Sequence, residues 1–179
     1  MNKLLTIEER AHARGLIAAF EDHIKTLPQI DVPITHHFSK GVYAREMRMK
    51  AGELVVGAIH KYENLNILSS GVAQVIYVDN LGEVVKLQIK APYTLVAKPG
   101  AKRVINAVTD IVWTTIHGTD ETDLEKIEEE FIAKDYSQVQ GISEQELKLI
   151  QEARHGLGNS SDIGISRDRI TFGEDERRR

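Results

Sequence analysis

Between residues 33 and 118 the chain reads as a succession of short strands, and no other feature constrains the fold as strongly. Apolar and polar side chains alternate along these strands, as in VVKLQIK at 84–90. Such alternation places one set of side chains inside a fold and the other set outside. Roughly eight or nine such strands predict a closed or sandwich-like antiparallel fold. Turn-forming residues separate the strands at 69–71, 79–82, Pro92 and Pro99-Gly100.

An amphipathic helix is expected before the strands, within residues 1–28. Its start carries a capping box, Thr6 with Glu9, in which the two side chains bond free backbone N–H groups of the first turn. Apolar side chains then recur near helical spacing, and Pro28 and Pro33 end the pattern. This apolar stripe has to pack against the strand region or against another subunit.

Two further helices are expected after the strands. The first spans about 123–134, with Thr122 and Glu125 as a second capping box. The other spans about 144–154 and begins at the N-cap residue Ser143. The predicted organisation is therefore an N-terminal helix, a strand region, a pair of C-terminal helices and a charged tail, at 1–28, 33–118, 119–156 and 157–179.

Composition excludes several classes of chemistry. The 179 residues carry a net charge of −4 and no cysteine, which excludes disulfides, thiolate zinc sites and cysteine nucleophiles. No apolar run of about 18 residues indicates a membrane span, and the N-terminus lacks a signal-peptide pattern, so we expect a cytoplasmic protein. Aromatic residues do not interleave with a basic patch, so no nucleic-acid partner is expected. No P-loop, G-x-S-x-G or H-E-x-x-H motif marks a catalytic centre.

The stretch GELVVGAIHKYENLNILSSG has a regular frame of glycines and polar residues. Gly52 is followed at fixed intervals by Ala58, His60, Asn64 and Gly71. This spacing resembles the first motif of the cupin superfamily, G-x5-H-x-H-x3-E-x6-G, whose two histidines and glutamate bind a metal. In the present chain alanine stands at the first histidine and asparagine at the glutamate.

The stretch PYTLVAKPGAKRVINA is similar in outline to the second cupin motif, G-x5-P-x-G-x2-H-x3-N. Gly100 keeps its place in the frame. Four other positions differ, because the first glycine, the proline, the histidine and the asparagine are replaced by Pro92, Lys98, Arg103 and Ala107. The position of the last metal-binding imidazole is thus taken by a guanidinium group.

The resemblance covers about residues 33–118 and implies a mainly β fold. The implied architecture is a cupin-type antiparallel jelly-roll barrel, here with one N-terminal helix and two C-terminal helices, and with a pocket in the barrel mouth. Metal-binding cupins hold Fe, Mn, Ni or Zn there through three histidines and a glutamate. Because this chain departs at three of those four positions, no cofactor is expected. The chain also looks like small cupin-like proteins encoded by tailed bacteriophages.

A pocket built from these residues favours binding of a small anion, a sugar or a nucleotide. Arginine presents a planar fork of donors that fits carboxylates and phosphates. An open alternative is that Arg103 pairs with Glu46 or Glu63 and only stabilises the barrel. The candidate ligand-binding residues are His60, Asn64, Arg103, Trp113 and His117.

A divalent metal is a further alternative for the same pocket. It needs three or four imidazole or carboxylate ligands. His60 and His117, joined by His36, are the residues that would supply them. The permanent charge of Arg103 beside such an ion opposes this arrangement.

Two functions follow from these alternatives. The favoured one is a non-catalytic binding or assembly protein, a phage virion or accessory component that acts through protein–protein contacts. Its expected partners are further copies of itself and other phage structural proteins, in the host cytoplasm or the virion. The alternative is a cupin pocket that binds a small anionic, sugar or nucleotide ligand, or a metal-dependent enzyme with an atypical site at His60 and His117. Residues 157–179 are expected to be ordered only by contact with another chain.

Overall fold

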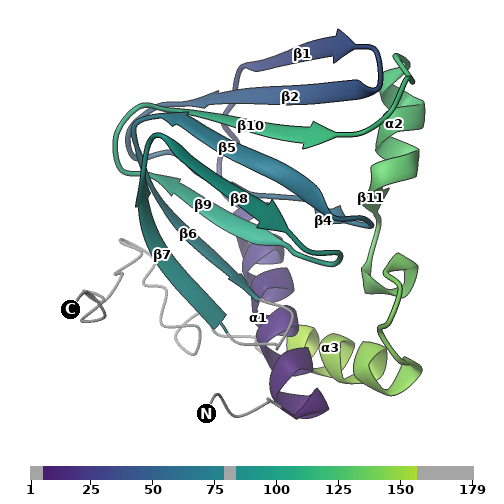
Figure 1. The fold of residues 1–179 in the computed structure, drawn as a ribbon. Coiled ribbons are helices and arrows are strands. Elements are labelled where there is room, and N and C mark those ends of the chain that lie inside the picture. Colours follow the sequence, from purple (N-terminus) through teal and green to yellow (C-terminus); the bar gives the residue numbers. More distant parts are fainter. Residues whose placement is uncertain (1–5, 79–83, 157–179) are drawn as a thin grey trace, which may run out of the picture.

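A computed structural model describes residues 6–78 and 84–156, as two antiparallel sheets with helices outside them (Figure 1). The predicted tail at 157–179 lies outside the described residues. The elements are α1 (Ile7–Ile24), β1 (Ile34–Ser39), β2 (Val42–Met49), β3 (Leu54–Val56), β4 (Ile59–His60), β5 (Asn64–Ser70), β6 (Val72–Val78), β7 (Val84–Lys90), β8 (Tyr93–Ala97), β9 (Arg103–Ala107), β10 (Ile111–His117), α2 (Leu124–Phe131), β11 (Ile132–Ala133), the 3₁₀ turn η1 (Tyr136–Gln138) and α3 (Glu144–Gly156).

The two large sheets have interleaved strand orders. One sheet runs β1-β2-β10-β5-β8 and the other runs β3-β9-β6-β7. Strands far apart in the chain, such as β2 and β10, are direct antiparallel neighbours. This confirms the predicted fold class, a mainly β antiparallel jelly roll with one N-terminal and two C-terminal helices. Figure 1 shows the sheets close together at one end and spread at the other, beside α2 and β11.

The core fills the space between the sheets. Trp113 of β10 lies opposite Met47 of β2 and Leu68 of β5. These three side chains are buried and pack with residues of the facing sheet, such as Ile105 of β9. Each buried apolar side chain of this size contributes about 2 kcal/mol of burial energy. The core therefore joins the two sheets, and Met47, Ile105 and Trp113 extend it to the cavity at the open end.

Helix α1 covers the outer face of the four-stranded sheet. The predicted capping box is confirmed, because Thr6 Oγ1 accepts from the Glu9 amide and the Glu9 carboxylate accepts from the Thr6 amide. Ile17 and Phe20 of the helix pack against Ile76 of β6. Within the described residues no helix is long and apolar enough to cross a membrane.

The second helix starts about where the sequence predicted, but its N-cap residue and its C-terminal end differ from the prediction. Asp123, not Thr122, is the N-cap, and its carboxylate accepts from the amides of Glu125 and Lys126. Helix α2 ends at Phe131, because the next residues form β11 and pair with Ile59 and His60 of β4. This short two-stranded sheet connects α2 to the strand that carries His60.

A glycine of the sequence motif occupies a conformation that other residues rarely adopt. Gly71, between β5 and β6, has φ +84°. A Cβ at this position would lie 2.1 Å from the carbonyl oxygen of Asp110. The turn therefore needs both the left-handed backbone and the missing side chain of glycine.

Candidate functional site

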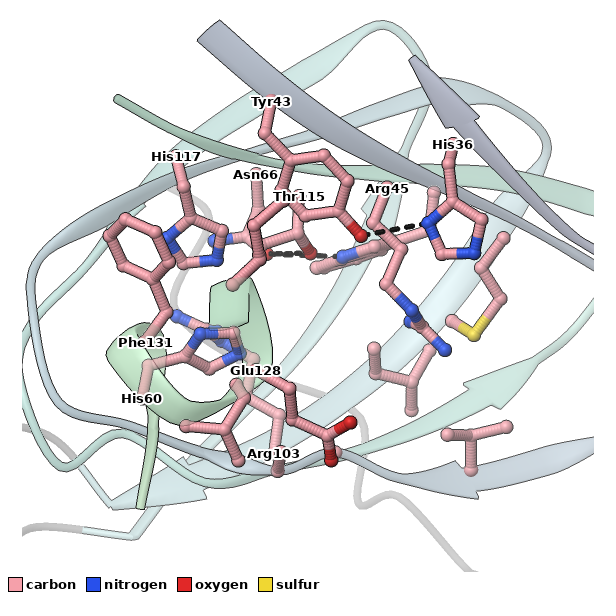
Figure 2. Close-up of a pocket in the computed structure, with 18 of the residues that line it drawn as sticks. His36, Tyr43, Arg45, His60, Asn66, Arg103, Thr115, His117, Glu128 and Phe131 are labelled. Carbon is pink, nitrogen blue, oxygen red and sulfur yellow. Dashed lines mark hydrogen bonds between the residues drawn. The ribbon is translucent and has the colours of Figure 1, made fainter. Parts of the chain in front are cut away.

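The open end of the sandwich holds a cavity of about 480 Å³. Its lining comes from both sheets and from one side of α2, and includes Arg103, His60 and His117 (Figure 2). The volume falls in the range of small-molecule sites. Four of the five predicted ligand-binding residues therefore line this cavity, namely His60, Arg103, Trp113 and His117.

Arg103 is a buried cation without an acidic partner. The residue is 5% exposed, and within the described residues no carboxylate lies within 4.0 Å of its guanidinium group. Glu46 is paired with His37 and Arg48, and Glu63 with Lys98, so the predicted internal pairing of Arg103 does not form. The guanidinium instead lies over the Tyr77 ring, 5.6 Å from its centroid. Its Nε atom is buried and has no hydrogen-bond partner in the same described ranges.

Burial lowers the pKa of Arg103 to about 10. The group therefore stays charged at neutral pH, although taking a charge out of water is unfavourable unless it is paired. Arg103 is the first residue of β9 and pairs with Tyr77 of β6. This places the side chain at the edge of the apolar core, where it faces the cavity.

Two neutral imidazoles lie together in the cavity. The rings of His60 and His117 stack with centroids 5.2 Å apart, and Phe131 of α2 packs on His117 at 4.4 Å. Burial lowers the pKa of His60 to about 3, helped by the nearby charges of His117 and Arg103. Burial also lowers the pKa of His117 to about 4. The Nδ1 atoms of both rings are buried and have no hydrogen-bond partner in the described part of the chain.

A polar network forms the floor of the cavity. Asn66 of β5 is 1% exposed, and its Oδ1 accepts from Trp113 Nε1 at 3.2 Å and from Thr115 Oγ1 at 3.0 Å. The predicted site residue Asn64 does not line the cavity. Its amide donates to the Tyr62 carbonyl and accepts from Asn66 Nδ2, so it orients Asn66 from behind.

Charged and aromatic side chains surround the cavity mouth. Figure 2 shows the Arg45 guanidinium and the Glu128 carboxylate extending toward the cavity from β2 and α2. Tyr43 donates to or accepts from His36 Nδ1 at 2.8 Å. The mouth therefore offers both a second cation and an acceptor, whereas the deep end offers Arg103 and the two histidines.

The residues present do not fit the metal of the cupin resemblance. Within the described ranges, no three His, Asp or Glu side chains group as metal ligands. The predicted set of His36, His60 and His117 is not brought together, because the Tyr43 ring stacks on His36 at 5.9 Å and on His117 at 6.4 Å. Two imidazoles beside the charged Arg103 are a poor donor set for a divalent cation.

Sequence reasoning missed several lining residues. Arg45 lies on the same face of β2 as Tyr43 and Met47, which point inward, so strand alternation could have predicted that it lines the cavity. Asn66 follows Asn64 on the same face of β5 and carried the same signal. Glu128 and Phe131 had none, because only the tertiary position of α2 brings them to the cavity.

No family model matches the chain, and no curated protein matches it. Solved structures to which the chain is similar include a cupin superfamily protein from Desulfitobacterium hafniense. The identity is 14%, with 52% of this chain and 83% of that chain covered and a TM-score of 0.42. A conserved protein with a double-stranded β-helix domain from Klebsiella pneumoniae is similar at 12% identity, with 54% and 85% covered and a TM-score of 0.43.

A recombinant oxalate oxidase in complex with glycolate is similar at 14% identity, with 51% of this chain and 53% of that chain covered and a TM-score of 0.44. The three similarities are therefore of the same low level. They concern the fold, and no activity of the present chain follows from them.

Proposed function

We propose that the cavity between the sheets binds a small anionic ligand, a carboxylate or a phosphate, with Arg103 as its principal contact. The observation that carries this proposal is the buried guanidinium without a carboxylate partner among the described residues. A buried unpaired charge costs on the order of several kcal/mol. A bound anion would remove that cost and form charge-assisted hydrogen bonds with the free donors of Arg103.

The other polar groups favour a ligand that also carries hydroxyl groups. His60 and His117 are neutral at physiological pH, and a neutral imidazole can accept a hydrogen bond at one nitrogen and donate at the other. Their Nδ1 atoms lack hydrogen-bond partners among the residues that the structure describes. Hydroxyl groups of a hydroxy acid or a sugar phosphate would supply partners without adding charge.

Trp113 provides a direct test, because it is the single tryptophan of the chain and lines this cavity. Its fluorescence should change saturably when lactate, malate or glucose 6-phosphate is added, and glucose alone should have a much weaker effect. Replacing Arg103 by glutamine should weaken the best of these anions at least about tenfold, because a charge-assisted contact is lost.

The matched control is Arg48→Gln. Arg48 lies on β2, a strand that also lines the cavity. Its side chain is 60% exposed, however, and pairs with Glu46 on the outer face. This variant should bind as the wild type does. Equal affinity of the Arg103→Gln and Arg48→Gln proteins for every anion, or no fluorescence response to any of them, would exclude the proposed site.

The sequence patterns also predicted an assembly role in a phage particle, self-association and a host-cytoplasmic or virion location. No finding tests these predictions, and they stay predictions. Binding of a small anion is compatible with each of them, because the cavity faces inward between the sheets.

A further inference from the structure

A second cavity, of about 400 Å³, lies outside the sandwich between α1, α3 and the segment from β11 to η1. At its border with the first cavity lies Ala58, which lines both. Lys102 faces the second cavity and the next residue, Arg103, faces the first. Successive residues of an extended chain point in opposite directions, so the two cations serve different cavities.

Lys102 is as deeply buried as Arg103, at 5% exposed. Its ammonium lies 3.1 Å from Glu21 Oε1, and the same oxygen lies 3.4 Å from the ammonium of Lys25. One carboxylate oxygen therefore faces two cations. An ammonium has three donors, and Glu21 is the single ion-pair partner of Lys102 among the described residues.

The lining of this cavity has more positive than negative groups. Its cations are Lys25, Lys102, Lys134 and Arg154, and its acids are Glu21 and Asp135. Asp22, which lies outside the lining, binds Arg154 through two contacts of 2.6 Å. Even with Arg154 neutralised in this way, one positive charge is left over.

The remaining acid, Asp135, is held by its own turn. Its carboxylate accepts from the amide and the hydroxyl group of Ser137, which lowers its pKa. Burial lowers the pKa of Lys102, against the opposite effect of Glu21. A second anion beside Lys102 would offset that burial and use its free donors.

We propose that this second cavity is a separate binding site for a small oxyanion, a phosphate or a carboxylate, anchored by Lys102 and bordered by Lys25 and Arg154. The site is distinct from the Arg103 cavity, because its lining comes mostly from α1, α3 and the β11–η1 segment, and Ala58 is the one residue that the two linings share. The proposal does not depend on the first site and survives its failure.

The experiment uses the full chain with Arg103 replaced by glutamine, so that the first cavity is disabled. Inorganic phosphate and citrate are titrated separately, and amide chemical shifts are followed by NMR. Saturable shifts are expected for the amides of residues 133–137 and Lys102, while Trp113 fluorescence stays unchanged. The probe that binds more tightly shows whether the site prefers a phosphate or a carboxylate.

In the same background Lys102→Met should weaken binding at least about tenfold. Lys148→Met is the control, because Lys148 is 79% exposed on α3 and pairs with Glu152. If Lys102→Met does not fold, the amide map with Lys102 intact decides the question. Absence of saturable shifts at residues 133–137 with both probes, or full binding by a folded Lys102→Met protein, would overturn the proposal.

Discussion

The rings of His60 and His117 stack with centroids 5.2 Å apart and 21° between their planes. The two residues are 57 positions apart in the sequence, and they meet because β4 and β10 converge at the cavity. Both rings are neutral at physiological pH, and neither Nδ1 atom has a hydrogen-bond partner within residues 6–78 and 84–156. The pair therefore has unused hydrogen-bonding capacity beside the cation of Arg103. This is the arrangement expected of a polar binding site rather than of an apolar core.

The lowered pKa values of the two histidines predict a pH dependence of stability. In the unfolded chain both titrate near 6.5, whereas in the folded protein they titrate near 3 and 4. Between about pH 4 and 6.5 the unfolded state therefore binds more protons, and the free energy of unfolding falls as the pH is lowered. Above about 6.5 this contribution is complete and constant.

Each histidine should contribute a slope of up to about 1.4 kcal/mol per pH unit within that window. Urea unfolding of the wild type between pH 5 and 7 measures how steeply the free energy of unfolding depends on pH. His60→Asn and His117→Asn should each reduce this slope by the amount that corresponds to about one bound proton. Between these pH values most carboxylates remain ionised, so the difference reports the histidines. An unchanged slope in both variants would show that the imidazoles titrate normally in the folded protein.

The ion pair between α1 and α3 should be costly to break. Glu146 of α3 is 4% exposed and contacts Arg14 of α1, with Arg10 at 3.9 Å. Replacing Glu146 by glutamine leaves the partly buried guanidinium of Arg14, which is 12% exposed, without its counter-charge. We expect a loss of about 3 kcal/mol in the free energy of unfolding. Chemical denaturation at neutral pH measures it.

The control on the same helix is Glu152→Gln. Glu152 pairs with Lys148 at 3.9 Å, but both side chains are exposed, so the change should stay below about 0.5 kcal/mol. Similar losses for the two substitutions would mean that burial does not strengthen the Glu146 contact.

The two glycines that frame the first sequence motif should respond differently to a methyl group. Both have positive φ, +87° at Gly52 and +84° at Gly71. At Gly52 a Cβ meets nothing within 4 Å, so Gly52→Ala should cost about 1 kcal/mol for the backbone alone. At Gly71 the Cβ meets the Asp110 carbonyl, so Gly71→Ala should cost at least about 3 kcal/mol. Thermal or urea unfolding compares them, and equal costs would refute the close approach.

The sequence contained enough local information for the strands and for part of the site. The motif spacing singled out His60 and Arg103, which line one cavity, and Trp113 and His117 were candidate ligand-binding residues that line it too. The boundary of α2 was not predictable in this way. Backbone pairing of Ile132 with His60, across 72 positions, ends that helix, and a local capping pattern carries no trace of it.

The charged residues show the same limit. Arg103 was recognised by its place in a motif, but whether it had an acidic partner depended on where Glu46 and Glu63 point. The ion pair of Lys102 with Glu21 joins a loop to a distant helix, and nothing in the local pattern of either segment indicates it. Long-range packing determines such ion pairs, and local sequence patterns do not predict that packing.

The central claim is that Arg103 is a buried charge that residues 6–78 and 84–156 leave without an acidic partner. The most direct measurement is the free energy of unfolding of Arg103→Met in the absence of added anions, compared with the wild type. A methionine fills similar space without the desolvation cost, so the variant should be more stable by about 1 kcal/mol or more. Arg48→Met, at an exposed site, should change stability by less than about 0.5 kcal/mol. A loss of stability of more than about 1 kcal/mol in Arg103→Met would contradict the account, because it would mean that the guanidinium is already compensated within the fold.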